Sequence, residues 1–350
     1  MNTLNTFINT RSFNTDELFL IVIRLDANDL LNFCLINKQT LRLYQTDRIW
    51  NYKLEKEFAE YLSDFNDLTN ININDNCYIN DMNMNKQRKY KLLYGLNKIK
   101  QIWDLNTNLT NLYNMHIFIL NNEGIQEIPK EIRYLHNLRL LRLNNNLLTV
   151  LPTELGQLYN LQILDLNSNR ITDIPKELGN LVNLQILDLS QNRIYEIVKE
   201  ICNLTNLQTL YLGNNKIQEL PKELGKLHKL EKLYLGNNNI RDLPTELKGL
   251  RNLRILYLSN NILKLPTELG KLTNLQSLDL SNNEITDLPT EVGQLLNLEF
   301  FYLSYNQISE LPKEISELHN LQMLYLNNNP IREISKEIKQ SLPNTRIYLQ

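Results

Sequence analysis

Cysteine, glycine and proline are all scarce in this chain of 350 residues, which has 3 Cys, 10 Gly and 10 Pro. Cys34, Cys77 and Cys202 are odd in number, lie far apart and form no CxxC pair. The sequence therefore predicts neither a disulfide framework nor a zinc site, and a reducing compartment fits it best. The residues in excess are Asn, Ile, Lys and Tyr, a bias typical of AT-rich coding, as in large DNA viruses or their protist hosts.

The chain also lacks a strong charge and a long hydrophobic run. Its formal net charge is -2, which gives no general attraction to nucleic acid or to membranes. The apolar run from Leu18 to Ile23 is about a third of the ~20 residues that a membrane span needs, and no basic segment typical of a secretory signal precedes it. We therefore expect a cytoplasmic or nuclear protein that binds neither nucleic acid nor membranes.

The chain is rich in one repeated motif, LxxLxLxxN. Its copies begin 23 residues apart, except for one step of 22 residues between Leu253 and Leu275. Repeats of this period are typical of solenoids, in which each unit covers the hydrophobic face of its neighbour. A weaker copy opens at Met115, and Arg346 to Leu349 can supply a last strand, so we count about ten units. The clear copies begin at Leu138, Leu161, Leu184, Leu207, Leu230, Leu253, Leu275, Leu298 and Leu321.

Each copy predicts a short strand with one buried face and one displayed face. In residues 161–166, the last two leucines fall on one face and Ile163 and Asp165 on the other, because side chains alternate along a strand. The Asn that follows would be costly to bury without partners, so we expect its amide to bond to the backbone of its own or a neighbouring turn. The column comprises Asn146, Asn169, Asn192, Asn215, Asn238, Asn261, Asn283, Asn306 and Asn329.

The second half of each 23-residue repeat, after the LxxLxLxxN motif, predicts a short helix. It reads Pro-Lys/Thr-Glu-Leu-Gly, with Pro where the helix begins, Glu in the first turn and Gly near the end. A column of Glu invites a calcium or general-acid interpretation, but a helix N-terminus favours negative charge by itself, so we assign the column a structural role. Leucines such as Leu158 and Leu181 then close the core from the side opposite the strands.

The LxxLxLxxN motif resembles the leucine-rich repeat family, and the Pro-Lys/Thr-Glu-Leu-Gly form is similar to the Ras-group class of these repeats. The resemblance implies an α/β fold, a curved solenoid with a parallel concave sheet and short convex helices. Members of this class act as intracellular binding scaffolds. The resemblance therefore implies a non-enzymatic protein-interaction module that needs no cofactor.

The residues between the buried leucines form columns on the displayed face. Tyr211, Tyr234 and Tyr257 on adjacent strands predict a wall of aromatic faces with outward hydroxyls, and Tyr is enriched at binding hot spots. Tyr is also a good strand residue, so a purely structural reading stays open. Asp165 and Asp188 add an acidic end, which favours a partner of basic and apolar character. The partner-binding candidates are Arg142, Asp165, Asp188, Tyr211, Tyr234, Tyr257, Asp279, Phe300, Tyr302 and Tyr325.

Histidines are too far apart to share a metal ion. His136, His228 and His319 occupy equivalent positions, but the closest two are four units apart, roughly 20 Å at strand spacing, whereas zinc ligands lie within about 2.1 Å of the ion. The sequence also contains no G-x-S-x-G, P-loop or H-E-x-x-H motif, and Cys202 stands in a small position usually taken by Gly. We expect neither a metal site nor a catalytic site.

Residues 11–60 follow a different pattern, in which apolar residues at helical spacing predict a compact three-helix unit. Leu25-Asp26, Asp29-Leu30 and Leu35-Ile36-Asn37-Lys38 resemble an F-box, although Phe13-Asn14 stands where that family has Leu-Pro. F-boxes bind the Skp-type adaptor of cullin ubiquitin ligases, so the resemblance implies an adaptor-binding surface. The alternative is a plain helical cap for the repeats. The implied adaptor-binding residues are Phe13, Leu18, Ile21, Leu30, Leu31, Leu35 and Ile36.

These patterns divide the chain into a tail (1–10), an F-box-like helical domain (11–60), a linker with a capping helix (61–100) and a leucine-rich repeat solenoid (101–350). The first hypothesis is a monomeric substrate receptor whose solenoid selects a target protein for a ubiquitin ligase. The alternative is a signalling scaffold, for example for a small GTPase, in which the helical block is only a cap. The basic segment Lys86 to Tyr94 predicts a helix with a solvated face rather than nucleic-acid binding.

Overall fold

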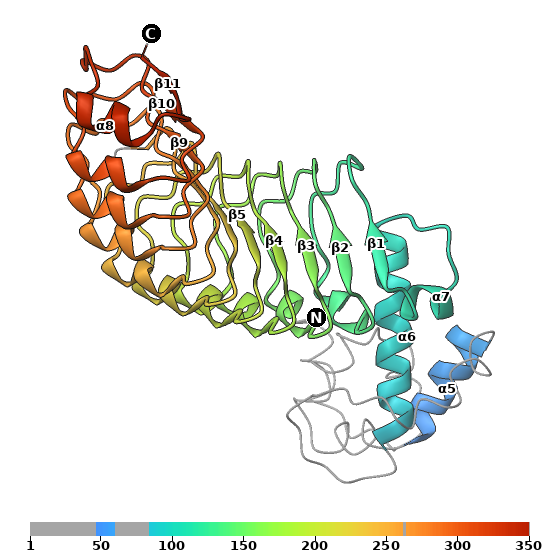
Figure 1. The fold of residues 1–350 in the computed structure, drawn as a ribbon. Helices are drawn as coiled ribbons and strands as arrows, with labels where there is room; N and C mark the ends of the chain where they lie inside the picture. Colours follow the sequence, from blue (N-terminus) through green and yellow to red (C-terminus); the bar gives the residue numbers. More distant parts are fainter. Residues whose placement is uncertain (1–46, 60–83, 262–263, 350) are drawn as a thin grey trace, which may run out of the picture. The chain divides into compact units, whose positions relative to one another are not determined.

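Residues 47–59, 84–261 and 264–349 are described by the computed structural model, which divides into two compact units between Asn114 and Met115 (Figure 1). The described part of the first unit is helical, with α5 (Asp47–Phe58), α6 (Met84–Ile102) and α7 (Leu109–Tyr113). Buried aromatic rings join α5 to α6. The ring centroids of Trp50 and Phe58 lie 5.4 and 5.6 Å from that of Tyr90, whose hydroxyl donates to Glu57 Oε2 at 2.7 Å.

The predictions for the N-terminal region meet the described residues only in part. The helix predicted at Lys86 to Tyr94 is confirmed as a segment of α6. The predicted adaptor-binding residues, from Phe13 to Ile36, lie outside the described residues, and so do the predicted tail and most of the predicted linker. In the described part of the chain, no helix combines the length and the apolar character that a membrane crossing needs.

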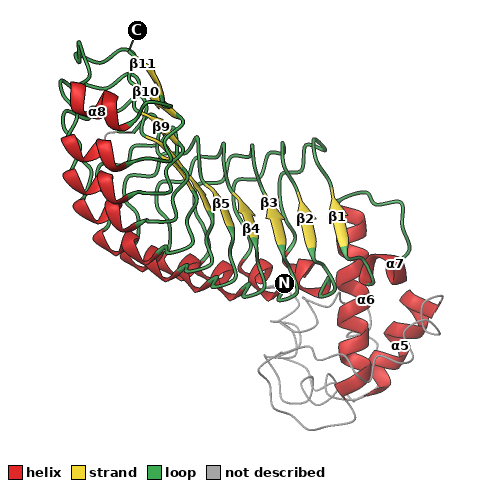
Figure 2. Ribbon diagram, viewed as in Figure 1, coloured by secondary structure: helices red, strands yellow, loops and turns green. Residues whose placement is uncertain are grey.

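The second unit contains an 11-stranded parallel sheet whose strands follow one another in sequence order (Figure 2). Equivalent residues of consecutive repeats pair in register, as Leu164 does with Leu187 and Asp165 with Asp188. A constant repeat length therefore produces straight columns of side chains. The strands are β1 (Ile117–Ile119), β2 (Leu140–Arg142), β3 (Ile163–Asp165), β4 (Ile186–Asp188), β5 (Thr209–Tyr211), β6 (Lys232–Tyr234), β7 (Ile255–Tyr257), β8 (Ser277–Asp279), β9 (Phe300–Tyr302), β10 (Met323–Tyr325) and β11 (Arg346–Tyr348).

Short 3-10 helices cover the convex side of this unit, where the sequence predicts short helices (Figure 2). A proline such as Pro175, with φ -67° and ψ 137°, stands extended just before each of them, except before η6, where Val198 takes its place. They are η3 (Lys130–Tyr134), η4 (Thr153–Gln157), η5 (Lys176–Asn180), η6 (Lys199–Asn203), η7 (Lys222–Lys226), η8 (Thr245–Gly249), η9 (Thr267–Lys271), η10 (Thr290–Gln294) and η11 (Lys313–Glu317). The last repeat has an α-helix instead, α8 (Lys336–Ser341).

The core of the solenoid is a stack of leucines contributed by every repeat. The middle residue of each inner strand, such as Leu164, is fully buried, and so are the leucines of the convex side, such as Leu178 and Leu181. Burying one such side chain stabilises the fold by about 1.5–3 kcal/mol. Each repeat needs its neighbours to complete this core, because one repeat alone leaves its leucines exposed on both flanks.

The asparagine column is bonded to the backbone, as predicted. Asn169 Nδ2 donates to the carbonyl oxygens of Leu143 and Leu166 at 2.9 and 3.0 Å, and the backbone N–H of Leu148 donates to its Oδ1 at 3.0 Å. The residue before each of these asparagines has a positive φ; for the nine of them it lies between 54° and 59°. This left-handed turn directs the asparagine side chain inward, where it joins two repeats.

Candidate functional site

The displayed face of the sheet consists of the first and third residues of each strand. Strands such as β3 and β4 have a fully buried middle residue between two half-buried ones. Every partner-binding candidate occupies one of these outward positions. Arg142 is exposed, and the other nine candidates, from Asp165 to Tyr325, are half-buried. The face that these outward positions form is called the concave face below.

The tyrosines of the concave face stack on one another along the column. The ring centroids of Tyr211 and Tyr234 lie 4.6 Å apart with an interplanar angle of 12°, and those of Tyr302 and Tyr325 lie 4.9 Å apart at 10°. These separations match the spacing of neighbouring strands, which brings equivalent rings into contact. The stacked rings turn their faces toward each other and leave mainly their edges for a partner, whereas the sequence predicts a wall of faces.

The second tyrosine stack has a third member that the candidates predicted from the sequence do not include. Tyr348 lies on β11 and is 38% exposed, and its ring stacks on Tyr325 at 4.5 Å between centroids. The signal was present, because Tyr348 follows Tyr325 by the same 23-residue step that separates Tyr325 from Tyr302. The second stack therefore comprises Tyr302, Tyr325 and Tyr348.

Asp279 interrupts the tyrosine column between the two stacks. The strand register places it directly beside Tyr257 on β7 and beside Tyr302 on β9. The rings of Tyr234 and Tyr257 meet at 87°, so Tyr257 is turned across the column rather than stacked along it. Asp279 is half-buried, and the backbone N–H of Ser281 donates to its Oδ1 at 2.9 Å.

The three aspartates of the concave face differ in their partners. Asp165 Oδ2 lies 3.8 Å from Nε of Arg142 in an ion pair. Asp188 accepts hydrogen bonds from the backbone N–H and the hydroxyl of Ser190. Asp279 accepts one hydrogen bond, from the backbone N–H of Ser281, and neither Asp188 nor Asp279 has an ion-pair partner among the residues that the structure describes. Asp279 therefore has the fewest polar partners of the three aspartates, so its carboxylate keeps the most capacity to bind an external cation.

Partial burial shifts the pKa of several titratable groups on this face upward, which favours their protonated forms. Burial raises the pKa of Tyr211, of Tyr234 and of Tyr302, and neighbouring Asp or Tyr side chains raise each of them further. Burial also raises the pKa of Asp188, and the charge of Asp165 adds to this effect. At neutral pH the tyrosines are therefore protonated and available as hydrogen-bond donors.

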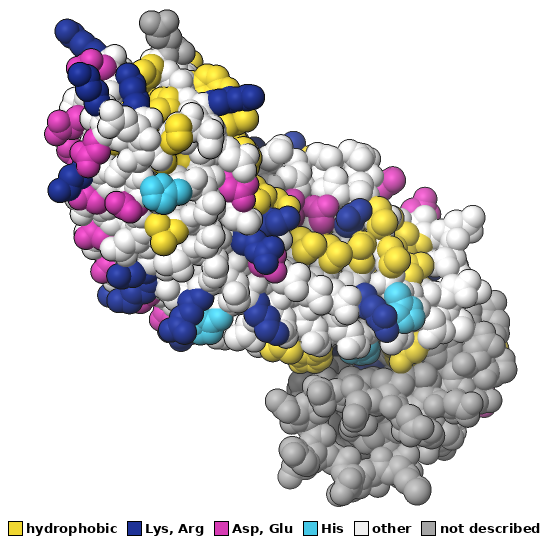
Figure 3. Space-filling view, in the orientation of Figure 1, with side chains coloured by type: hydrophobic (Ala, Val, Ile, Leu, Met, Phe, Trp, Pro, Cys, Tyr) yellow, Lys and Arg dark blue, Asp and Glu magenta, His cyan; other side chains and the backbone are white. Residues whose placement is uncertain are grey.

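A second column, the first residue of each strand, is apolar near β1. Ile117 is 59% exposed, while Leu140, Ile163 and Ile186 are half-buried. Hydrophobic side chains gather over strands β1 to β4 in the space-filling view (Figure 3). The concave face thus offers apolar contacts at its β1 end and tyrosine edges from β5 onward.

No group of three or more His, Cys, Asp or Glu side chains is placed to hold a metal ion in residues 47–59, 84–261 and 264–349. Cys202 is buried, and burial together with the charges of Glu223 and Glu200 raises its pKa to about 12. A thiol with so high a pKa is a poor nucleophile. Cys202 therefore fills a small position in the packing between repeats, as predicted.

Sequence models of leucine-rich repeat families match most of the repeats. Models described as a leucine-rich repeat region match residues 93–210 and 153–258, a leucine rich repeat model matches residues 273–331, and a model of two repeat copies matches residues 251–291. The chain belongs to the leucine-rich repeat family, whose members are in general non-enzymatic binding scaffolds. No curated protein matches the chain.

Solved structures show the same fold. A leucine-rich repeat protein of Leptospira interrogans is 35% identical, with a TM-score of 0.52, over 67% of this chain and 72% of that one. An internalin of Listeria monocytogenes is 26% identical, with a TM-score of 0.56, over 74% and 81%. The ectodomain of the Arabidopsis thaliana receptor kinase GASSHO1/SCHENGEN3 is 33% identical, with a TM-score of 0.53; the match covers 66% of this chain but only 33% of the receptor chain.

Proposed function

We propose that the concave face binds a segment of a partner protein and that Tyr257, Asp279 and Tyr302 anchor it. The leucine-rich repeat fold supports a protein-interaction module in general. The observation that carries the finer proposal is the half-buried carboxylate of Asp279, which has no cationic partner among the described residues and stands between two tyrosines. The similar Arabidopsis ectodomain was solved in complex with Casparian strip integrity factor 2, which supports a macromolecular ligand.

The chemistry of this anchor favours a basic side chain in the partner. Tyr302 stacks on Tyr325 on one side and has Asp279 on the other, and Tyr257 is turned across the column. An ammonium or guanidinium group placed over Asp279 would combine an ion pair with cation–π contacts to the flanking rings. Such contacts contribute about 0.5–2 kcal/mol where water is excluded. Apolar residues of the same segment would pack on the tyrosine edges and on the isoleucines near β1.

Affinity capture from a eukaryotic lysate tests this proposal when it compares matched variants. The double change Tyr234→Ala, Tyr257→Ala should weaken capture by about 30-fold or more for each ring that is a hot spot of about 2 kcal/mol. The control is Tyr159→Ala, Tyr195→Ala, because these two rings are exposed but lie outside the strands. Equal capture by the two variants would show that the tyrosine column is not the binding surface.

We further propose that the chain is a substrate receptor of a cullin ubiquitin ligase in the cytoplasm or nucleus. This proposal rests on the F-box resemblance of residues 11–60, whose adaptor-binding candidates lie outside the described residues. The change Leu30→Asp should abolish co-purification of a Skp-type adaptor, while Tyr234→Ala should leave it intact. If the unchanged chain recovers no adaptor, the ligase proposal fails.

The alternative is a signalling scaffold that binds a small GTPase. The feature that favours it is the Pro-Lys/Thr-Glu-Leu-Gly form of the repeats, which resembles the Ras-group class. Under this alternative, the chain captures a GTPase in a nucleotide-dependent way and Leu30→Asp has no effect on that capture. Recovery of a Skp-type adaptor by the unchanged chain supports the receptor proposal, and nucleotide-dependent capture of a GTPase without an adaptor supports the scaffold.

A further inference from the structure

Glycines allow neighbouring 3-10 helices on the convex side to approach closely. In η5, a Cβ added to Gly179 would lie 2.2 Å from the backbone oxygen of Glu200 in the next repeat, and at Gly225 the distance to Glu246 O would be 2.1 Å. The same holds at Gly156, Gly270 and Gly293. Because real side chains do not approach a carbonyl so closely, a larger residue at this position forces the next repeat away.

The last two residues of η8 are a lysine and a glycine in the opposite order to those of η7 and η9. Where η7 has Gly225-Lys226 and η9 has Gly270-Lys271, η8 has Lys248-Gly249. Gly249 makes the close approach on the side of η7, since an added Cβ would lie 2.3 Å from Gly225 O. Lys248 has a Cβ where η9 would otherwise approach. The repeat that follows is also the short one, with 22 residues instead of 23.

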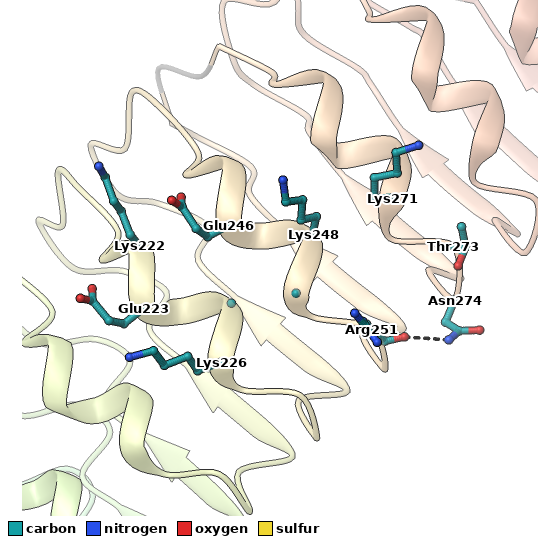
Figure 4. A pocket seen from close by; sticks show the side chains of 11 residues that line it. Lys222, Glu223, Lys226, Glu246, Lys248, Arg251, Lys271, Thr273 and Asn274 are labelled. Atoms are coloured by element: carbon teal, nitrogen blue, oxygen red, sulfur yellow. Dashed lines mark hydrogen bonds between the residues drawn. The ribbon is translucent and has the colours of Figure 1, made fainter.

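A cavity of about 960 Å³ opens on the convex side at this irregular junction (Figure 4). Its volume is at the upper end of the range for ligand-binding pockets, about 300–1,000 Å³. Both Gly225 and Gly249 contribute to its wall, together with residues of η7, η8 and η9. The cavity therefore lies where the exchanged residues disturb the regular stacking.

The cavity is lined by five cations and two carboxylates. The cations are exposed, and among the described residues none of the five takes part in an ion pair. Lys271 Nζ donates a hydrogen bond to Gln294 Oε1 at 3.2 Å. The local excess of positive charge contrasts with the net charge of -2 of the whole chain. The cations are Lys222, Lys226, Lys248, Arg251 and Lys271, and the carboxylates are Glu223 and Glu246.

We propose that this cavity, the convex groove, binds an extended acidic polypeptide segment. Lys226 and Lys271 point toward opposite ends of the groove, and Glu246 lies between Lys222 and Lys248 (Figure 4). A single phosphate would need donors that converge on one point, and these ammonium groups do not converge. The two carboxylates disfavour the dense charge of a nucleic acid. An extended chain with spaced Asp or Glu residues can reach separated lysines while it avoids the carboxylates.

Hydrogen bonds fix the backbone at the edge of the groove. Asn274 Nδ2 donates to the carbonyl oxygen of Arg251 at 2.7 Å, which joins the segment after η9 to the segment after η8 (Figure 4). Nδ1 of His228 lies 3.0 Å from the carbonyl oxygen of Gly249. The groove therefore has a defined wall, from which flexible lysine side chains extend.

The decisive variant exchanges two residues and leaves composition and charge unchanged. Lys248→Gly combined with Gly249→Lys gives η8 the order found in η7 and η9. The loss of the Cβ at position 248 lets η9 approach, while the new Cβ at position 249 would lie 2.3 Å from Gly225 O and forces η7 to shift, so the shape of the groove should change. The probe is a fluorescein-labelled peptide in which glutamates are separated by serines, and its binding to the full chain is followed by fluorescence anisotropy. We expect the unchanged protein to bind it in a salt-dependent way, and the exchanged variant to bind about tenfold more weakly or worse.

A second pair of variants separates groove binding from general attraction. Lys226→Gln, Lys271→Gln removes two groove charges without altering the glycines, and should weaken binding by about tenfold. The matched control, Lys176→Gln, Lys199→Gln, removes two exposed lysines at the starts of η5 and η6 and should bind like the unchanged protein. Circular dichroism confirms that each variant is folded.

Three results would overturn the proposal. The first is no binding of the peptide by the unchanged protein. The second is equal weakening by the groove pair and the control pair, which would show diffuse electrostatic attraction. The third is tighter binding of a single-stranded oligonucleotide at the same groove, which would assign the site to nucleic acid. None of these results depends on the concave face, so the two proposals can fail separately.

Discussion

The backbone N–H of Ile171 donates a hydrogen bond to the side-chain Oδ1 of Asn192 at 2.9 Å, although the two residues belong to consecutive repeats. The Nδ2 of the same amide donates to the carbonyl oxygens of Leu166 and Leu189 at 3.0 and 3.1 Å. Asn192 is only 8% exposed, so water cannot easily replace these bonds. One side chain thus joins two repeats and holds its own turn.

Replacing Asn192 by Ala should therefore lower the free energy of unfolding by about 2–4 kcal/mol, because several buried backbone groups lose their partner at once. Urea unfolding followed by circular dichroism measures this loss. The matched control is Asn183→Ala, since Asn183 is exposed and makes one bond, from Nδ2 to Tyr159 O at 2.8 Å. Equal losses in the two variants would contradict a special role for the buried column.

The close approach of neighbouring repeats predicts that a methyl group added at the contact lowers stability. Gly179→Ala places a Cβ 2.2 Å from Glu200 O, and the required displacement should cost about 1–3 kcal/mol. The control is Gly213→Ala, where the nearest atom, Gly236 O, is 3.2 Å away. The thermal midpoint of Gly179→Ala should lie clearly below that of Gly213→Ala, and the reverse order would be inconsistent with this packing.

The raised pKa of Asp188 predicts how the stability of an Asp188→Asn variant depends on pH. This pKa is raised by burial, so the ionised carboxylate is disfavoured in the folded chain, and Asp188→Asn should increase the free energy of unfolding at neutral pH. As the pH falls below the ordinary value of 3.8, the carboxyl is protonated in both the folded and the unfolded chain. The advantage of the variant should therefore shrink in acid.

Asp173→Asn serves as the control for this measurement, because Asp173 is exposed and its replacement removes the same charge. Denaturant titrations across the acid range compare the two variants. A gain in Asp188→Asn that grows toward low pH would have the wrong sign and would exclude this explanation.

The burial of Cys202 predicts that its thiol resists alkylation in the folded chain. Burial raises its pKa to about 12, so almost no thiolate forms near neutral pH. In a Cys34→Ser, Cys77→Ser background, iodoacetamide should leave Cys202 unmodified in the native chain and modify it in denaturant, as judged by mass spectrometry. Rapid modification under native conditions would show that this junction between repeats opens readily.

Much of the repeat fold could be predicted from the sequence, because each element is set by local spacing. The period of 23 residues predicts the strands from β2 to β10, and the cost of burying an unpaired amide predicts the backbone bonds of the asparagine column. The 3-10 geometry of η3 to η11 was not predicted, because a five-residue segment after Pro carries no signal that separates it from one α-helical turn.

The candidate site was predicted as a set of columns but not in its details. Tyr257 lies across Tyr234 at 87°, whereas Tyr211 and Tyr234 stack, and such side-chain packing has no sequence period. The convex groove was missed for a similar reason. The exchanged order Lys248-Gly249 is visible in the sequence, but its consequence depends on the approach of Gly225 O and the next repeat.

Site-specific photo-crosslinking tests the central claim, that the concave face binds a protein segment, most directly. A benzoylphenylalanine placed at Tyr302 lies beside Asp279 on the concave face, and one placed at Tyr195, which is 51% exposed, lies outside the strands. We predict that illumination in a eukaryotic lysate gives a discrete protein adduct from position 302 and none from position 195, and that Asp279→Asn reduces its yield. An adduct from position 195 with none from position 302 would contradict the account.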